Sequence, residues 1–156
     1  AGTFGAPFYR KVFWRPPQRL VAPVAGTMGF GMPAAVAAGL RYPGRQVVGL
    51  VGDGGAFMTG GEFAVAVARG AAVKMVVSVN GSYASIRIHQ EREHPGRVSG
   101  TDLVNPDFVK WAECFGVPVT VIETKADFPR LEEALAAPGA GVIVVRTSLK
   151  AVLPAA

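Results

Sequence analysis

Cysteine, long apolar runs and early acidic residues are all scarce in this sequence of 156 residues. Cys114 is the only cysteine, so no disulfide can form within the chain, and its helical surroundings favour a buried thiol over a nucleophile. The apolar runs are far shorter than the roughly 20 residues of a membrane-spanning helix. No signal-peptide pattern opens the chain. We therefore expect a soluble, cytoplasmic protein with no membrane partner.

Acidic residues are absent from the first 52 positions, which carry six Arg or Lys, and Asp53 is the first carboxylate. The six basic residues follow no single helical stripe and no nucleic-acid-binding motif. This pattern argues against a nucleic-acid partner and favours a solvated or interface face.

Aromatic residues are concentrated at one end, because five of the fourteen lie within the first fourteen positions. A short terminal segment cannot easily bury so many rings by itself. We predict one domain over residues 1–156, in which segment 1–19 packs on another domain or subunit.

The rest of the chain alternates between strand and helix patterns. Apolar runs without polar alternation predict strands covered on both faces, at 20–25, 46–51, 73–79, 117–122 and 142–146. Helices are predicted at 33–40, 63–69 and 127–137, with one more ending at 115 after a cap at 105–107. The predicted fold class is α/β: a single three-layer domain with a mostly parallel central sheet and helices on both faces.

Two local signals refine this scheme. Thr59 followed by Glu62 is a capping-box pattern that predicts the start of helix 63–69, with Gly70 as its stop. Residues 81–104 show no sustained periodicity. A structureless stretch of that length is usually functional.

The strongest candidates for chemistry are Asp53 and Asn80, which each follow a predicted strand. Ligands of parallel α/β sheets bind at the carboxyl ends of strands, so these side chains can converge on one cation. Both are hard oxygen donors, which suits Mg²⁺, and that ion takes its other ligands from water and phosphate. Gly54 and Gly55 allow backbone N–H groups to approach an anion closely before a helix begins. A diphosphate would fit there.

A dinucleotide site is the main alternative from these residues. Gly29, Gly31 and Ala34, after a predicted strand and before a helix, fit the dinucleotide fingerprint, with Asp53 on a ribose hydroxyl. That reading does not explain the glycines around Asp53 or its partner Asn80. A tight turn without function is a further alternative for residues 26–31.

Gly52-Asp53-Gly54 followed by Asn80 resembles the cofactor motif of thiamine diphosphate (ThDP)-dependent enzymes. The resemblance is to their C-terminal cofactor-binding domain, as found in acetolactate-synthase-like enzymes. In that family the Asp and Asn side chains bind Mg²⁺, together with a backbone carbonyl that falls here on Ser82. The resemblance implies further cofactor contacts from Gly52, Gly54, Gly55 and Tyr83.

Segment 26–33 resembles the part of acetolactate synthases that holds the aminopyrimidine ring of ThDP. By position, Met28 is the apolar wedge that bends the cofactor, and its N–H meets the pyrimidine. The carbonyl of Gly26 accepts from the 4′-amino group, and Thr27 lies between them. The resemblance runs from about Phe4 to Arg146. One departure is Val79, where the family often has Asn or Asp.

The family resemblance implies a ThDP- and Mg²⁺-binding domain of an enzyme that decarboxylates a 2-oxo acid and transfers or releases the aldehyde unit. No catalytic residue is expected in this chain, because the activating Glu comes from a pyrimidine-binding domain or subunit. We expect the chain alone to be inactive and the full enzyme to be a homodimer or tetramer. Alternatives are a benzoylformate- or oxalyl-CoA-type decarboxylase and a non-catalytic ThDP-binding module. Asp53→Ala is expected to abolish Mg²⁺-dependent ThDP binding without disturbing the fold.

Overall fold

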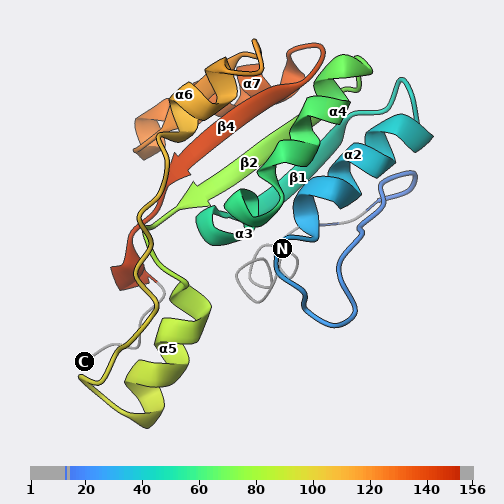
Figure 1. Ribbon diagram of the computed structural model, residues 1–156. Coiled ribbons are helices and arrows are strands. Elements are labelled where there is room, and N and C mark those ends of the chain that lie inside the picture. Colours follow the sequence, from blue (N-terminus) through green and yellow to red (C-terminus); the bar gives the residue numbers. More distant parts are fainter. Residues whose placement is uncertain (1–12, 14, 152–156) are drawn as a thin grey trace.

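The computed structural model describes residue 13 and residues 15–151 of the chain. Most of segment 1–19 lies outside these residues, so its packing on another domain stays a prediction. One sheet with the strand order β1-β2-β4-β3 forms the centre, and all neighbouring strands are parallel (Figure 1). Its strands are β1 (Val47–Gly52), β2 (Val73–Val79), β3 (Val119–Ile122) and β4 (Gly141–Arg146).

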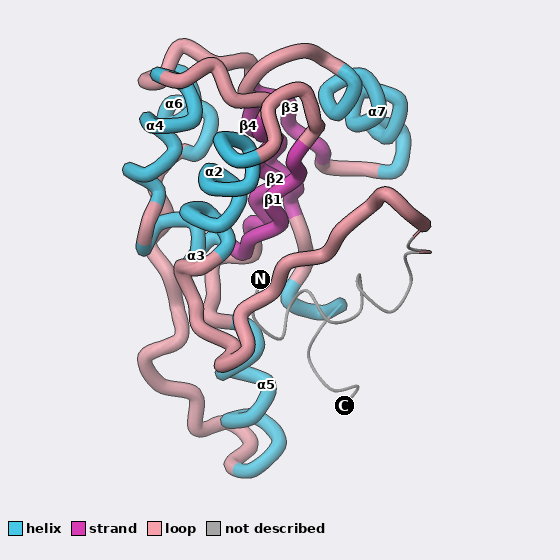
Figure 2. The backbone as a smooth tube through the Cα atoms, turned by 90° about the vertical axis from the view of Figure 1, so that its right-hand side faces the viewer, coloured by secondary structure: helices cyan, strands magenta, loops and turns pink. Residues whose placement is uncertain are grey.

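Helices cover both faces of this sheet. The main ones are α2 (Gly31–Arg41), α4 (Phe63–Ala68), α6 (Phe108–Glu113) and α7 (Phe128–Ala136). Figure 2 shows α2, α4 and α6 on one side of the strands and α7 on the other. The predicted three-layer α/β architecture is therefore confirmed. None of the helices in the described ranges has the length and apolar character needed to cross a membrane.

The core lies between the sheet and the α2, α4 and α6 layer. Met32, Phe63, Met75 and Val77 are completely buried there, and burying such side chains contributes about 1.5–3 kcal/mol each. Gly49 lets α2 approach β1 closely, because a Cβ at this position would lie 3.0 Å from the Cβ of Ala35 in α2. The sheet edge that carries Asp53 and Asn80 is therefore held on a rigid core.

The strand predicted at 20–25 is wrong, because these residues form no strand and only a turn at Val24 and Ala25. A strand needs a neighbour for its backbone groups, and none of the four sheet strands pairs with this segment. The dinucleotide fingerprint requires a strand directly before its glycines. The structure therefore removes the context on which that alternative depended.

The end of β1 also differs from the prediction. Helix α3 (Asp53–Met58) starts at Asp53 itself, whereas the sequence predicted no helix before 63–69. The capping box of Thr59 and Glu62 does not form, and a 3₁₀ turn (Gly60–Glu62) leads directly into α4. The hydroxyl of Thr59 donates to the carbonyl of Gly29 instead, so a tertiary contact replaces the local one. Gly70 ends this region with φ +62°, as predicted.

The stretch predicted to lack structure contains helix α5 (Ala84–Glu93). No residue of α5 is buried, and a helix without a buried face has no apolar stripe to detect in the sequence. Figure 1 shows α5 projecting beyond the carboxyl ends of the strands. The other predicted elements are present with small shifts; β3 begins at Val119 because Pro118 has no N–H to donate.

Candidate functional site

Asp53 and Asn80 meet at the carboxyl edge of the sheet. Gly52, the last residue of β1, pairs with Ser78 in β2, so the two strands end side by side. Oδ2 of Asp53 accepts hydrogen bonds from the backbone N–H groups of Asn80 at 3.0 Å and Gly81 at 2.7 Å. The two halves of the predicted metal motif, 27 residues apart, are therefore in direct contact.

The carboxylate of Asp53 is almost completely enclosed, with 2% of the residue exposed. Its Oδ1 accepts from the N–H of Gly54 at 3.0 Å, and its Oδ2 also accepts from Nδ2 of Asn105 at 2.8 Å. A buried charge is expensive unless hydrogen bonds or an ion compensate it. These donors hold the carboxylate in one orientation.

Asn105 was not among the predicted site residues. It lies 52 residues from Asp53 in the chain, and the sequence placed it only in a helix cap. The burial of a carboxylate demands donors, but no spacing rule indicates which residue supplies them. Asp107 makes the cap, since its side chain accepts from the N–H groups of Val109 and Lys110.

The turn after Asn80 presents the backbone of Ser82 to the site. The side-chain oxygen of Asn80 accepts from the N–H of Ser82 at 3.0 Å, and Gly81 adopts φ +71°, which only glycine tolerates easily. The Ser82 hydroxyl donates to the carbonyl of Thr101 at 2.9 Å, and Ser82 also pairs with Asp102 in a short antiparallel bridge. These contacts hold the residues that precede α5 next to Asn80.

The predicted pyrimidine segment lies against the predicted diphosphate segment. Gly29 adopts φ +80°, and its carbonyl accepts a hydrogen bond from the Thr59 hydroxyl at 2.7 Å. A Cβ added to Gly55 would lie 3.7 Å from the N of Gly29. Gly26, Thr27 and Met28 are exposed at the start of this turn, and 37% of Met28 is accessible.

Tyr83 lies directly on the start of α3. A Cβ added to Gly54 would be 2.4 Å from Cε1 of the Tyr83 ring and 3.2 Å from Cδ1 of Leu103. Only a glycine leaves room for the ring at this distance. Of the ten predicted cofactor residues, hydrogen bonds join Asp53 to Gly54 and Asn80, and Asn80 to Ser82.

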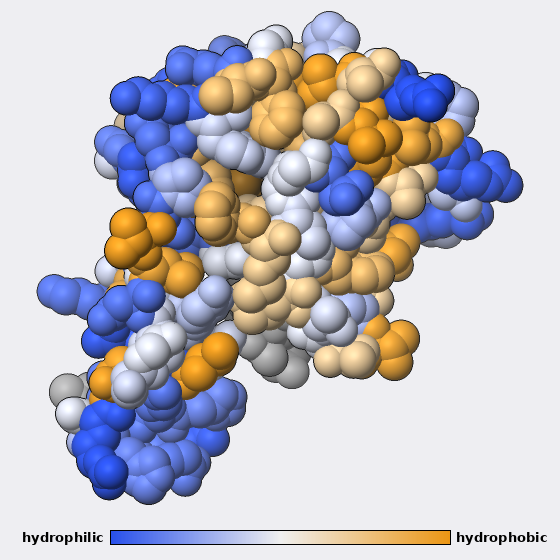
Figure 3. Space-filling model, viewed as in Figure 1, coloured by the Kyte–Doolittle hydropathy of each residue, from blue (hydrophilic) through white to orange (hydrophobic). Residues whose placement is uncertain are grey.

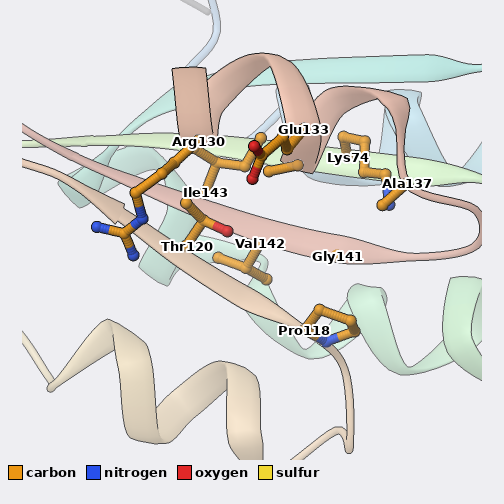
Figure 4. Close-up of a pocket in the computed structure, with 10 residues that line it drawn as sticks. Lys74, Pro118, Thr120, Arg130, Glu133, Ala137, Gly141, Val142 and Ile143 are labelled. Carbon is orange, nitrogen blue, oxygen red and sulfur yellow. The ribbon is translucent and has the colours of Figure 1, made fainter. Parts of the chain in front are cut away.

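Two hollows lie at opposite ends of the strands. A cavity of about 590 Å³ opens beside the carboxyl ends of β2 and β4, and its walls include Asn80, Gly81, Asn105 and Arg146. The other, of about 250 Å³, lies under α7 at the amino ends of the strands (Figure 4). Lys74 and Glu133 line this second cavity, and neither Asp53 nor Asn80 does. The first cavity therefore adjoins the candidate site, and the second is separate from it.

The donor set fits one magnesium ion. No three His, Cys, Asp or Glu side chains within the described ranges gather to hold a metal. One enclosed carboxylate, one amide oxygen and one backbone carbonyl are the hard ligands that Mg²⁺ accepts when phosphates and water complete its shell. The first turn of α3 adds N–H groups without intrahelical partners, which suit a phosphate.

Fold and site together define a parallel α/β domain whose candidate ligand site lies at the carboxyl edge of its sheet. Residues 2–145 match the family model described as thiamine pyrophosphate enzyme, C-terminal TPP binding domain. The chain belongs to this family, whose domains bind thiamine diphosphate, typically with Mg²⁺.

Similar proteins include acetolactate synthases and a benzoylformate decarboxylase. The large subunit of acetolactate synthase from Parasynechococcus marenigrum is 43% identical over 94 residues, which cover 59% of this chain and 15% of that protein. The mitochondrial acetolactate synthase of Schizosaccharomyces pombe is 32% identical over 94% of this chain and 22% of its own length. Benzoylformate decarboxylase of Pseudomonas aeruginosa is 34% identical over 90% of this chain and 27% of its own length.

A solved structure has the same fold. The thiamine diphosphate-dependent 4-hydroxybenzoylformate decarboxylase of Rhodococcus jostii RHA1 superposes with a TM-score of 0.74 and is 38% identical. The match covers 81% of this chain and 24% of that one. The chain therefore spans about a quarter or less of the proteins it matches.

Proposed function

We propose that this chain forms the magnesium and diphosphate half of a ThDP site. The side chains of Asp53 and Asn80 and the backbone carbonyl of Ser82 are the protein ligands of Mg²⁺. Gly52, Gly54, Gly55 and Tyr83 surround the diphosphate, and Gly26, Thr27 and Met28 hold the aminopyrimidine ring.

The observation that carries this proposal is the contact between Asp53 and Asn80. Oδ2 of Asp53 lies 3.0 Å from the backbone N of Asn80, so both side chains start from one place at the edge of the sheet. The bond from Thr59 to Gly29, at 2.7 Å, supports the second half of the proposal, because it joins the pyrimidine segment to α3. A dinucleotide site would require neither contact.

When bound, ThDP supplies the electron sink for the loss of carbon dioxide from a 2-oxo acid. The residues of this chain bind and orient it. Asp53 and Asn80 would hold the diphosphate end through the metal, Met28 would support the bent cofactor, and the carbonyl of Gly26 would accept a hydrogen bond from the 4′-amino group. None of these residues needs to move a proton itself.

The activity of the full enzyme is also a proposal: decarboxylation of a 2-oxo acid and transfer or release of the aldehyde unit, as in acetolactate synthases. The proposal includes a pyrimidine-binding domain or partner subunit with the activating Glu, a homodimeric or tetrameric enzyme, and inactivity of this chain alone. Exposed apolar side chains beside the site support a partner surface, since Phe57 is 65% and Met58 52% accessible.

The similar proteins suggest two classes of substrate. The acetolactate synthase of Schizosaccharomyces pombe and the benzoylformate decarboxylase match this chain about equally well, at 32% and 34% identity over 94% and 90% of its length. An aromatic 2-oxo acid is therefore the second candidate substrate class beside pyruvate. A cytoplasmic location stays a prediction.

Calorimetric or ligand-observed NMR titration of the full chain with ThDP tests the proposal. We expect binding with Mg²⁺ that disappears with excess EDTA, and no binding of NAD in parallel. The matched variant is Asp53→Asn, which keeps the shape of the side chain and removes its charge. NAD binding without ThDP binding, or ThDP affinity that is unaffected by EDTA and by Asp53→Asn, would show that the assignment is wrong.

A further inference from the structure

We propose that Asn105 is a positioning residue for the metal-binding carboxylate, and that Oδ1 of Asp53 is the oxygen that contacts the cation. The inference rests on the proposed function, because it concerns the same metal site. Its basis is the unequal distribution of hydrogen-bond donors over the two oxygens of Asp53.

Oδ2 of Asp53 accepts three hydrogen bonds: from the backbone N–H of Asn80 at 3.0 Å, from that of Gly81 at 2.7 Å, and from Nδ2 of Asn105 at 2.8 Å. A carboxylate offers about four acceptor sites over its two oxygens. Three donors therefore leave Oδ2 no free lone pair for a metal.

Within the part of the chain that the structure describes, Oδ1 of Asp53 has a single donor, the N–H of the adjacent Gly54 at 3.0 Å. Its remaining lone pair is available. The carboxylate is thus divided into a structural oxygen, tied to the loops after β2, and a functional oxygen at the start of α3. A cation that approached Oδ2 would have to displace N–H donors first.

The amide of Asn105 suits this role because it carries no charge. A Lys or Arg at this position would also bond the carboxylate, but its positive charge would repel Mg²⁺. An amide N–H holds the oxygen and leaves the negative charge of Asp53 for the metal. Such outer partners of metal ligands are typical of metal sites.

The backbone holds Asn105 in place from both sides. On the preceding side, the N–H of Leu103 donates to the carbonyl of Gly81 at 2.9 Å, and Asp102 pairs with Ser82. On the following side, Asp107 caps α6. The side chain of Asn105 is half-buried between these anchors, so its position follows from the fold.

The test compares Mg²⁺ affinity at a fixed, saturating ThDP concentration in the full chain and in two variants, measured by calorimetry. Asn105→Leu keeps the branching of the side chain and removes the donor, and we expect Mg²⁺ binding to weaken roughly 10- to 100-fold. Asn105→Gln keeps an amide donor and is expected to recover part of the affinity. A purely structural role would lower the melting temperature of both variants without this difference in metal affinity.

Gln90→Leu is the matched control, because it also removes a side-chain amide, in this case from helix α5. Its side chain bonds the backbone of Ser99 and not Asp53, so Mg²⁺ affinity is expected to stay unchanged. Equal Mg²⁺ affinity in the unmodified chain and Asn105→Leu overturns this inference alone. Absence of Mg²⁺-dependent ThDP binding in the unmodified chain overturns the proposed function and, with it, this inference.

A crystal structure with ThDP and Mn²⁺ in place of Mg²⁺ tests the division of the carboxylate directly. We expect the ion on Oδ1 of Asp53 and the amide of Asn105 still on Oδ2. An ion bound to Oδ2, or to both oxygens, would contradict the assignment.

Discussion

The hydroxyl of Thr59 donates to the carbonyl of Gly29 across 2.7 Å, and 30 residues of chain separate the two. This bond joins the end of α3 to the turn that precedes α2. It places Met28 and Gly55 on neighbouring surfaces, and these residues belong to the two halves of the proposed cofactor site.

Thr59→Val should therefore weaken both folding and cofactor binding. The variant keeps the shape of the side chain and loses one hydrogen bond, which contributes about 1 kcal/mol. Chemical denaturation and ThDP titration measure the two effects. Thr120→Val is the control, since no hydrogen bond of the Thr120 side chain occurs within the described residues, and Thr59→Ser should restore both properties. Unchanged ThDP affinity in Thr59→Val would show that the bond to the turn at Gly29 does not contribute to cofactor binding.

Asp53→Ala should cost stability as well as metal binding, contrary to the expectation from sequence that the fold would be undisturbed. The side chain accepts from Gly54, Asn80, Gly81 and Asn105, and its loss leaves these donors without that acceptor. A buried unsatisfied group costs about 1–3 kcal/mol. Urea denaturation in the absence of ThDP measures this loss. The midpoint of Asp53→Asn is expected to lie between those of the unmodified chain and Asp53→Ala. An Asp53→Ala midpoint equal to that of the unmodified chain would refute the enclosure of this carboxylate.

Gly54→Ala tests the packing of Tyr83 on the start of α3. The new Cβ would lie 2.4 Å from the Tyr83 ring, so the ring must move, and overpacking of this kind costs about 1–3 kcal/mol. We expect a lower melting temperature and weaker ThDP binding. Gly61→Ala is the matched control because a Cβ there meets no atom within 4 Å. Equal melting temperatures of the two variants would show that the ring yields without cost.

Lys74 should make stability depend on alkaline pH. Burial lowers the pKa of its ammonium group from 10.5, only 2% of the residue is exposed, and Nζ donates to the carbonyl of Pro138 at 3.3 Å. Figure 4 shows the side chain beneath α7 at the edge of the second cavity. The unfolded chain thus binds more protons than the folded one between the lowered pKa and 10.5, so stability rises with pH across that window.

Lys74→Met should remove this rise and increase stability at neutral pH, where the buried charge is penalised. Denaturation midpoints at several pH values between 7 and about 11 measure it. The exposed Lys110 offers a control in Lys110→Met, whose pH profile should match that of the unmodified chain. A Lys74→Met profile with the original slope would show that another group is responsible.

The surface of α5 differs in hydropathy from the surface of α2 and α4. Figure 3 shows a hydrophilic region at α5 and apolar side chains over α2 and α4. The sequence of α5, with four charged residues among ten, explains why it projects into solvent. Its lack of a buried face also explains why its helical structure could not be detected from apolar periodicity.

The sequence by itself determined the alternation of strands and helices, the parallel sheet and the convergence of Asp53 with Asn80. These follow from local rules: apolar runs predict buried strands, and the carboxyl ends of parallel strands meet at one edge. Only the tertiary structure decided that 20–25 forms no strand, that Thr59 bonds Gly29 and not its own helix, and that Asn105 completes the shell of Asp53. Each of these depends on which partner lies within hydrogen-bonding distance, and a buried donor or acceptor takes the partner that packing supplies, whatever its distance along the chain.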